Sequence, residues 1–193
     1  MTPAHPNETR RQQLLDRIEE IFLAEGFLHT RIGTLADTLH CSRSTLYKLA
    51  PSKSELYVLI LDRWLNRSTD QVLAATRDLD TPMQKIEEAA NLTAKLQSQV
   101  SPEFWRDARS FGPTAERFSE AQARGIRRIR SYLDEGVESG FFHPANTAFV
   151  AYVIWLGVNA ARDPDLTQRL GLDQEAATRE LGELVLRGMR ARP

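Results

Sequence analysis

Apolar residues recur three and four positions apart along nearly the whole of this chain of 193 residues. That spacing places them on one face of an α-helix. No stretch shows the strict alternation of apolar and polar residues that predicts a half-buried strand, and no Asn-Gly or Asp-Gly pair marks a hairpin. We therefore predict an all-α fold of about nine helices. A chain of this length buries a sizeable core without disulfides.

Capping residues indicate where the helices begin and end. Gly26 should end a first helix. Thr30 and Ser42 should each cap a short helix, the first of which ends near His40. Later starts and stops follow the same pattern: Thr81-Pro82, Ser101-Pro102 and Asp173 mark starts, and Gly112-Pro113, Gly140 and Asp163-Pro164 mark stops.

The turn between the two short helices is the most informative segment. Only His40, Cys41 and Ser42 separate them, so the two helices must cross steeply, as in a helix-turn-helix. Such a crossing exposes the second helix. Its first turn can then enter a major groove of DNA, while Leu46 faces the core. Lys53 follows at the start of a long connector helix, where the unpaired backbone N–H groups favour an anion.

Charge is distributed unevenly, although the net formal charge is only −1. Between residues 28 and 53 the chain has four basic residues, Arg31, Arg43, Lys48 and Lys53, against the single acidic Asp37. A local surplus of this size suits a short stretch of phosphate backbone.

The same segment resembles the TetR family of bacterial transcriptional regulators over about residues 10–62. The matching positions are Phe22, Gly26-Phe27, Thr30, Ile32, Leu35-Ala36, Ser42 to Tyr47, Pro51-Ser52-Lys53 and Leu56. The resemblance implies that the helix after Ser42 recognises DNA. It also implies that Tyr47 and Lys53 contact phosphates and that Arg43 and Ser44 read bases.

Three positions depart from the family's pattern. His40 stands where glycine is usual and is expected to adopt a positive φ angle, which histidine tolerates better than a β-branched residue. Leu49-Ala50 replaces a usual His-Phe pair, which removes a phosphate or groove contact. Gly33 replaces a long side chain that often contacts bases, which leaves Thr34 as the candidate on that helix and more of the reading to Arg43. The predicted DNA contacts are therefore Thr34, Arg43, Ser44, Thr45, Tyr47, Lys48 and Lys53.

Each of these residues also has a purely structural interpretation. Ser42 and Thr45 could serve only as caps, and Tyr47 could be an aromatic at the edge of the core. Lys48 and Arg31 could be merely solvated. DNA binding is predicted from the ordered set and not from any single residue.

The remainder of the chain is predicted to be a helical body for ligand binding and dimerisation. We place the helix-turn-helix domain at residues 8–55 and the body at residues 56–193. The body is rich in aromatic residues, and a few polar groups among them could orient a small ligand in an apolar cavity. The candidate ligand contacts are Phe104, Trp105, Arg109, Phe111, Tyr132, Trp155 and Asn159.

The last two helices have the composition of a dimer surface. Small residues alternate with apolar ones along residues 146–162 and 173–190, which lets two helices approach closely and form a four-helix bundle with their symmetry copies. Packing within one chain is the alternative. A cluster of arginines at Arg124, Arg127, Arg128 and Arg130 lies near Asp134, Glu135 and Glu138, and is interpreted as a solvated face with salt bridges.

Several other classes of function lack support. The four histidines, His5, His29, His40 and His143, show no zinc-ligand spacing, and Cys41 is interpreted as a small turn residue rather than a nucleophile. We expect no enzyme activity, metal or cofactor. The longest apolar run, residues 148–158, is about half of what a membrane helix needs, and the chain opens on polar residues. We therefore expect no membrane association and a cytoplasmic protein.

These features together predict a regulator of transcription, most often a repressor in this family. A homodimer would bind a near-palindromic operator, with one head per half-site. An unknown small-molecule effector would change the separation of the heads. Two alternatives stay open: a ligand-binding or enzymatic helical bundle with a vestigial head, and a DNA-binding adaptor whose body engages a protein partner.

Overall fold

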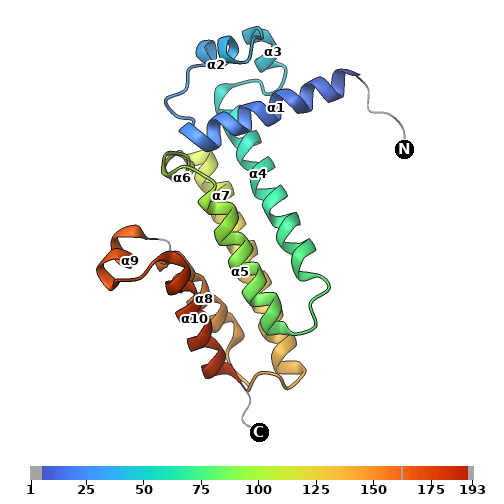
Figure 1. Cartoon of the computed structure of the whole chain (residues 1–193). Coiled ribbons are helices and arrows are strands. Elements are labelled where there is room, and N and C mark those ends of the chain that lie inside the picture. The colour runs from blue at the N-terminus through green and yellow to red at the C-terminus, as the bar shows by residue number, and fades with distance from the viewer. Residues whose placement is uncertain (1–5, 162, 191–193) are drawn as a thin grey trace. The chain divides into compact units, whose positions relative to one another are not determined.

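A computed structural model describes residues 6–161 and 163–190; the opening residues 1–5, including His5, lie outside this range. Within it, the chain forms ten α-helices and no strand, which confirms the all-α prediction (Figure 1). The helices are α1 (Pro6–Glu25), α2 (Ile32–Thr38), α3 (Arg43–Tyr47), α4 (Lys53–Thr76), α5 (Pro82–Ser98), α6 (Pro102–Ser110), α7 (Gly112–Glu138), α8 (Thr147–Ala160), α9 (Pro164–Leu170) and α10 (Gln174–Met189).

Most predicted helix boundaries are confirmed, because they depend on residues within one turn. Gly26 follows the end of α1 with a φ of 77°, a conformation that suits glycine. Ser42 caps α3 and Ser101 caps α6, each accepting a hydrogen bond from the backbone N–H three residues later. The predicted cap at Thr30 is wrong: the N-cap of α2 is Arg31, which makes no side-chain capping bond.

Helix α9 is the one that the sequence patterns missed. The sequence pattern predicts a stop at Asp163-Pro164, but in the structure these two residues start a helix. The Asp163 carboxylate accepts hydrogen bonds from the backbone N–H groups of Asp165 and Leu166, and Pro164 occupies the first helical turn. Gly171, with a φ of 68°, ends the helix after seven residues.

The chain divides into two compact units. Unit 1 comprises residues 1–70 and 94–121, and unit 2 comprises residues 71–93 and 122–193. The divisions fall within α4, α5 and α7. They describe packing alone, so the functional boundary between residues 55 and 56 stays a prediction.

The core of unit 1 joins α1, α2, α3, α4 and α6. Two apolar rows of α4 are buried in it: Leu56, Ile60 and Trp64 form one, and Tyr57, Leu61 and Leu65 form the other. Fully buried side chains from different helices meet in this cluster, among them Ile18, Phe22, Leu35, Leu46 and Phe104. This core fixes α2 and α3 relative to α1 and α4.

Two polar connections stabilise unit 1 further. The buried carboxylate of Glu19 on α1 pairs with Arg67 and, at 3.5 Å, with Nε of Arg63, both on α4. Asp107 on α6 is also buried, and its Oδ2 accepts hydrogen bonds from the backbone N–H groups of Phe27 (2.7 Å) and Leu28 (2.9 Å). The loop between α1 and α2 is therefore anchored to α6.

Unit 2 has its own core around α7, α8 and α10. A Cβ atom at Gly136 of α7 would overlap the buried ring of Phe142, and one at Gly157 of α8 would lie 2.7 Å from Leu181 of α10. Each glycine thus allows a close approach. No helix in the described part of the chain combines the length and apolar character that crossing a bilayer requires.

Candidate nucleic-acid interface

Helices α2 and α3 are adjacent short helices, joined by a turn of the predicted kind (Figure 1). His40 adopts a φ of 50°, which confirms the expectation that histidine replaces the usual glycine in a left-handed conformation. The backbone N–H of Cys41 bonds to the carbonyl of Ala36 at 3.0 Å. Leu35, Leu39 and Leu46 are buried beneath the turn, so the polar residues of α3 face outward.

A network of hydroxyl groups organises the first turn of α3. The Oγ of Ser42 lies 2.8 Å from Oγ of Ser44 and 2.8 Å from Oγ1 of Thr45, and it accepts the backbone N–H of Thr45 at 3.1 Å. Capping therefore engages three hydroxyls at once. The guanidinium of Arg43, in the same turn, makes no hydrogen bond or ion pair with any described residue, so its five N–H donors are all available.

The predicted DNA contacts lie in α2, α3 and the start of α4, all within unit 1. Five of them are exposed, namely Thr34, Arg43, Ser44, Tyr47 and Lys48, whereas Thr45 and Lys53 are half-buried. Tyr47 exposes 47% of its surface, so it is not a core aromatic. Whether these side chains contact DNA stays a prediction, but their exposure permits it.

Lys53 has an additional role within the protein. Its Nζ donates a hydrogen bond to the carbonyl oxygen of Leu28 at 3.2 Å and lies 5.3 Å from the centre of the Tyr57 ring. The ammonium group thus stabilises the loop before α2. It has two further donors with which to bind a phosphate.

Helix α1 contributes basic residues that sequence reasoning missed. An open groove of about 730 Å³ runs beside α1 and the turn before α3. Arg10, Arg11 and Arg17 line it together with His40 and Lys48, and Glu8 is the one carboxylate among its lining residues. Arg10 and Arg17 are seven residues apart, which places them on one helix face. The spacing of Arg10 and Arg17 predicts a basic helix face from the sequence alone. Only the structure shows that this face lies beside the turn before α3.

Cys41 lies in the same groove and is half-buried. Burial raises the pKa of its thiol, and the nearby charge of Arg10 lowers it to a smaller extent. A thiol with a raised pKa forms less of the reactive thiolate at neutral pH. This agrees with the interpretation of Cys41 as a turn residue.

The predicted ligand contacts fall in different units. In unit 1, Phe104 is fully buried and Trp105 and Phe111 pack against the same core, while Arg109 is exposed and lies 5.9 Å from the Phe118 ring. In unit 2, Tyr132, Trp155 and Asn159 are half-buried, and Asn159 donates a hydrogen bond to the carbonyl of Trp155 at 2.7 Å.

The arginine cluster of α7 differs in part from the expected solvated face. Arg130 pairs with Asp134 at 3.6 Å, as expected. Arg128 is instead half-buried, and its Nε has neither solvent contact nor an acceptor among the described residues. Burial lowers the pKa of this guanidinium, while the nearby Tyr132 raises it slightly.

Tyr132, one turn beyond Arg128, is fixed by Thr76. The two hydroxyl oxygens are 2.8 Å apart, and the Thr76 hydroxyl also donates to the carbonyl of Val72. A hydroxyl has one proton, so Tyr132 must donate to Thr76. Within the described ranges, no group of three His, Cys, Asp or Glu side chains is placed to hold a metal ion.

Comparison with solved structures places this arrangement in a known fold. A regulator from Saccharomonospora viridis, solved with choline, has a TM-score of 0.80 at 16% identity and covers 96% of this chain and 100% of its own. A TetR regulator from Haloarcula marismortui has a TM-score of 0.77 at 16% identity and covers 95% and 100%. The chain has the TetR fold.

Sequence comparison gives a shorter match. The HTH-type transcriptional activator FasR of Mycolicibacterium smegmatis is 31% identical over 84 residues, which is 44% of this chain. The match spans 38% of the length of FasR. No family model matches the chain. The likeness to the TetR fold therefore depends on the structure.

Proposed function

We propose that this chain is a DNA-binding regulator of transcription that acts as a homodimer in the cytoplasm and responds to a small molecule. One observation carries the proposal. Leu35, Leu39 and Leu46 hold α2 and α3 on a rigid core, while Arg43 and Lys48 project from α3 with no ion pair to any described residue. A protruding helix with unpaired basic side chains fits the major groove of a duplex.

The basic groove beside α1 supports the same function. Arg10, Arg17 and Lys48 bring positive charge from two helices to one surface. Phosphate contacts of this kind fix the position of a protein on DNA, whereas groups in the groove read its sequence. We assign Lys48 and Tyr47 to phosphates and Arg43 to bases.

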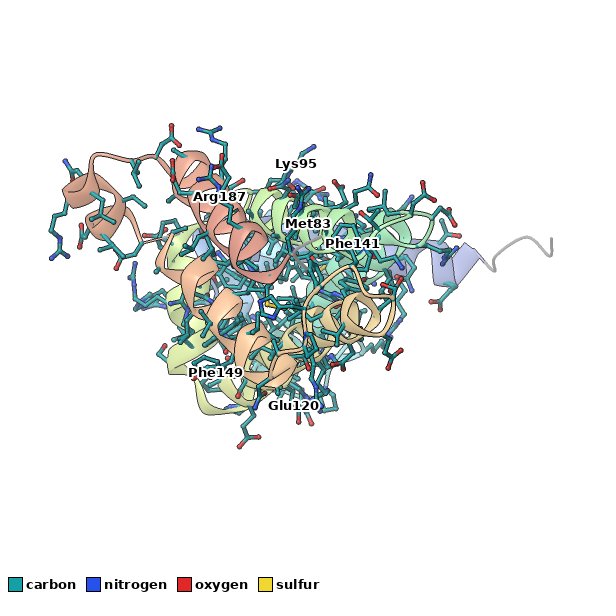
Figure 2. All side chains as sticks on the ribbon, turned by 90° about the horizontal axis from the view of Figure 1, so that it is seen from below. Met83, Lys95, Glu120, Phe141, Phe149 and Arg187 are labelled. Atoms are coloured by element: carbon teal, nitrogen blue, oxygen red, sulfur yellow. The ribbon has the colours of Figure 1, made fainter. Side chains whose placement is uncertain are left out.

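Dimerisation is proposed through α8 and α10 of unit 2. Large apolar side chains are exposed along these helices: Phe149, Tyr152, Val153 and Leu156 on α8, and Leu184 on α10. Phe149 exposes 66% of its surface and Leu184 exposes 70% (Phe149 is labelled in Figure 2). The four residues of α8 recur three and four positions apart and so share one face of that helix, and an exposed apolar face of this kind marks a protein interface. A two-fold dimer would present one α3 to each half of a near-palindromic operator.

Light scattering tests the dimer directly. The wild-type protein should have twice the mass of the chain, and Leu184→Glu together with Phe149→Glu should shift it towards one chain, because charges in an apolar interface are costly. A wild-type monomer at the concentrations used for DNA binding would exclude the proposed interface.

An effector site is proposed in unit 2, near Arg128 and Tyr132. A half-buried guanidinium without an acceptor is costly, and an anionic group of a ligand would satisfy it. The choline-bound neighbour shows that a protein of this fold holds a small molecule.

Repression stays a prediction, since FasR is named an activator. A reporter gene placed behind the operator shows whether the protein represses or activates transcription.

Selection of bound duplexes from fragments of the source genome tests DNA binding. The proposal predicts that a limited set of sequences with two related half-sites is recovered. Fluorescence anisotropy should then show that Arg43→Ala weakens binding about 5- to 150-fold, because a bidentate base contact contributes about 1–3 kcal/mol. Lys95→Ala, which removes an exposed charge of α5, should leave the affinity unchanged. Recovery of no sequence, or equal effects of both variants, would contradict the proposal.

A further inference from the structure

The guanidinium of Arg43 lies directly over Gly33 of α2. A Cβ atom at position 33 would be 2.7 Å from Nη2 of Arg43, 3.3 Å from Cζ and 3.4 Å from Nε. A contact of 2.7 Å is closer than real Cβ atoms tolerate. The head group therefore occupies a space that exists only because residue 33 has no side chain.

We infer that Gly33 is a specificity determinant: it seats the Arg43 guanidinium against α2 and so directs this side chain towards a guanine in the major groove. The role of Gly33 rests on the proposed binding of duplex DNA. Arg43 is the first residue of α3 and Gly33 the second residue of α2. The contact between the Arg43 guanidinium and Gly33, called the seat below, therefore joins the two helices of the helix-turn-helix.

The chemistry of the first turn of α3 favours Arg43 as the residue that reads a base. The hydroxyls of Ser42, Ser44 and Thr45 are engaged with one another in the cap. The guanidinium of Arg43 has five N–H donors, and no described residue accepts a hydrogen bond from them. Its planar fork matches the O6 and N7 acceptors of guanine, the most frequent specific contact in protein–DNA complexes.

A guanidinium that is already held against α2 also loses less conformational entropy when it binds DNA. An arginine side chain has many rotamers, and fixing them on binding costs conformational entropy. Contact with the bare backbone of α2 restricts these rotamers before DNA arrives. A methyl group at position 33 would displace the head group and leave it without a fixed direction.

Gly33→Ala is a clean perturbation, because it moves a side chain and spares the backbone. Gly33 lies in α2 without a positive φ angle, so alanine fits the helix. The displaced atoms belong to the far end of a flexible side chain. Gly125→Ala is the matched control: it lies in helix α7, and its Cβ would meet nothing within 4 Å.

A double-mutant cycle with Arg43→Ala tests the seat. On the duplex that the wild-type protein selects, Gly33→Ala should weaken binding about tenfold and reduce the preference for one guanine in each half-site. In the Arg43→Ala background, Gly33→Ala should change the affinity by less than about twofold. Replacing that guanine by 7-deazaguanine removes the N7 acceptor but keeps O6, so the affinity of the wild-type protein should fall part of the way towards that of Arg43→Ala.

The outcomes separate this inference from the proposed function. If the wild-type protein selects no duplex, DNA binding itself fails. If it selects a duplex and Gly33→Ala keeps the wild-type affinity and base preference, DNA binding stands and the seat is refuted. An equal loss from Gly33→Ala with and without Arg43 also refutes the seat, because the glycine would then act independently of the arginine.

Discussion

Replacing Asp107 by alanine should destabilise the protein, because it removes the acceptor that holds the loop between α1 and α2. One carboxylate oxygen of Asp107 accepts two backbone hydrogen bonds, at 2.7 Å from Phe27 and 2.9 Å from Leu28. The Phe27 bond is buried, so its loss should cost about 2 kcal/mol. Leu28 is half-buried and water can replace part of its bond, so we assign it about 1 kcal/mol. The expected loss is about 3 kcal/mol.

Urea denaturation followed by circular dichroism measures this loss. For a chain of this size, about 3 kcal/mol corresponds to a fall in Tm of roughly 10 °C. Asp107→Asn should lose about half as much, because one amide oxygen can still accept both bonds without the help of a charge. Asp37→Ala, at an exposed site of α2, should stay within about 0.5 kcal/mol. A loss below about 1 kcal/mol for Asp107→Ala would refute the anchoring of the loop by α6.

Three further predictions concern unit 2. Gly136→Ala should lower the free energy of unfolding by about 1–3 kcal/mol in urea melts, because its Cβ would overlap the ring of Phe142, whereas Gly125→Ala should not. Arg128→Met should raise the free energy of unfolding of the ligand-free protein by about 0.5–1 kcal/mol, because it removes a half-buried guanidinium whose Nε has no acceptor. The figure is kept small because water reaches the exposed part of that group. A lower free energy of unfolding would show that Arg128 has a structural partner. Hydrogen bonds to the carbonyls of Pro144 and Gly188 raise the pKa of His143 above 6.5. Their stabilising effect should be complete below about pH 6.5 and lost as the pH rises through the higher folded pKa. The protection factors of the amides at residues 188–190, which correct for the intrinsic rise of exchange with pH, should therefore fall over that range in the wild type but not in His143→Gln.

Local capping chemistry made much of the fold predictable. Ser42, Ser101 and Asp173 satisfy N–H groups within three residues of themselves, so their roles follow from a short window of sequence. The same chemistry operates at Asp163-Pro164, where the sequence pattern predicts a stop but a helix begins. The cap at Thr30 was wrong because α2 begins without any side-chain cap.

Contacts between distant parts of the chain were not predictable in the same way. Nothing near Asp107 in the sequence indicates that it binds a loop some 80 residues away. The arginines of α1 acquire a role only when packing places them beside Lys48. Gly33 and Arg43 could each be singled out from the sequence, but their contact could not, because it depends on how α2 and α3 cross.

The salt dependence of operator binding tests the central claim most directly. If the face formed by α3 and the basic groove beside α1 binds phosphates, the logarithm of the affinity should fall linearly with the logarithm of salt concentration between about 50 and 200 mM. Lys48→Ala should reduce that slope by about one for each protomer, and Lys95→Ala should leave it unchanged. A flat slope for the wild type, or a slope that Lys95→Ala reduces as much as Lys48→Ala, would contradict the assignment of this face to DNA.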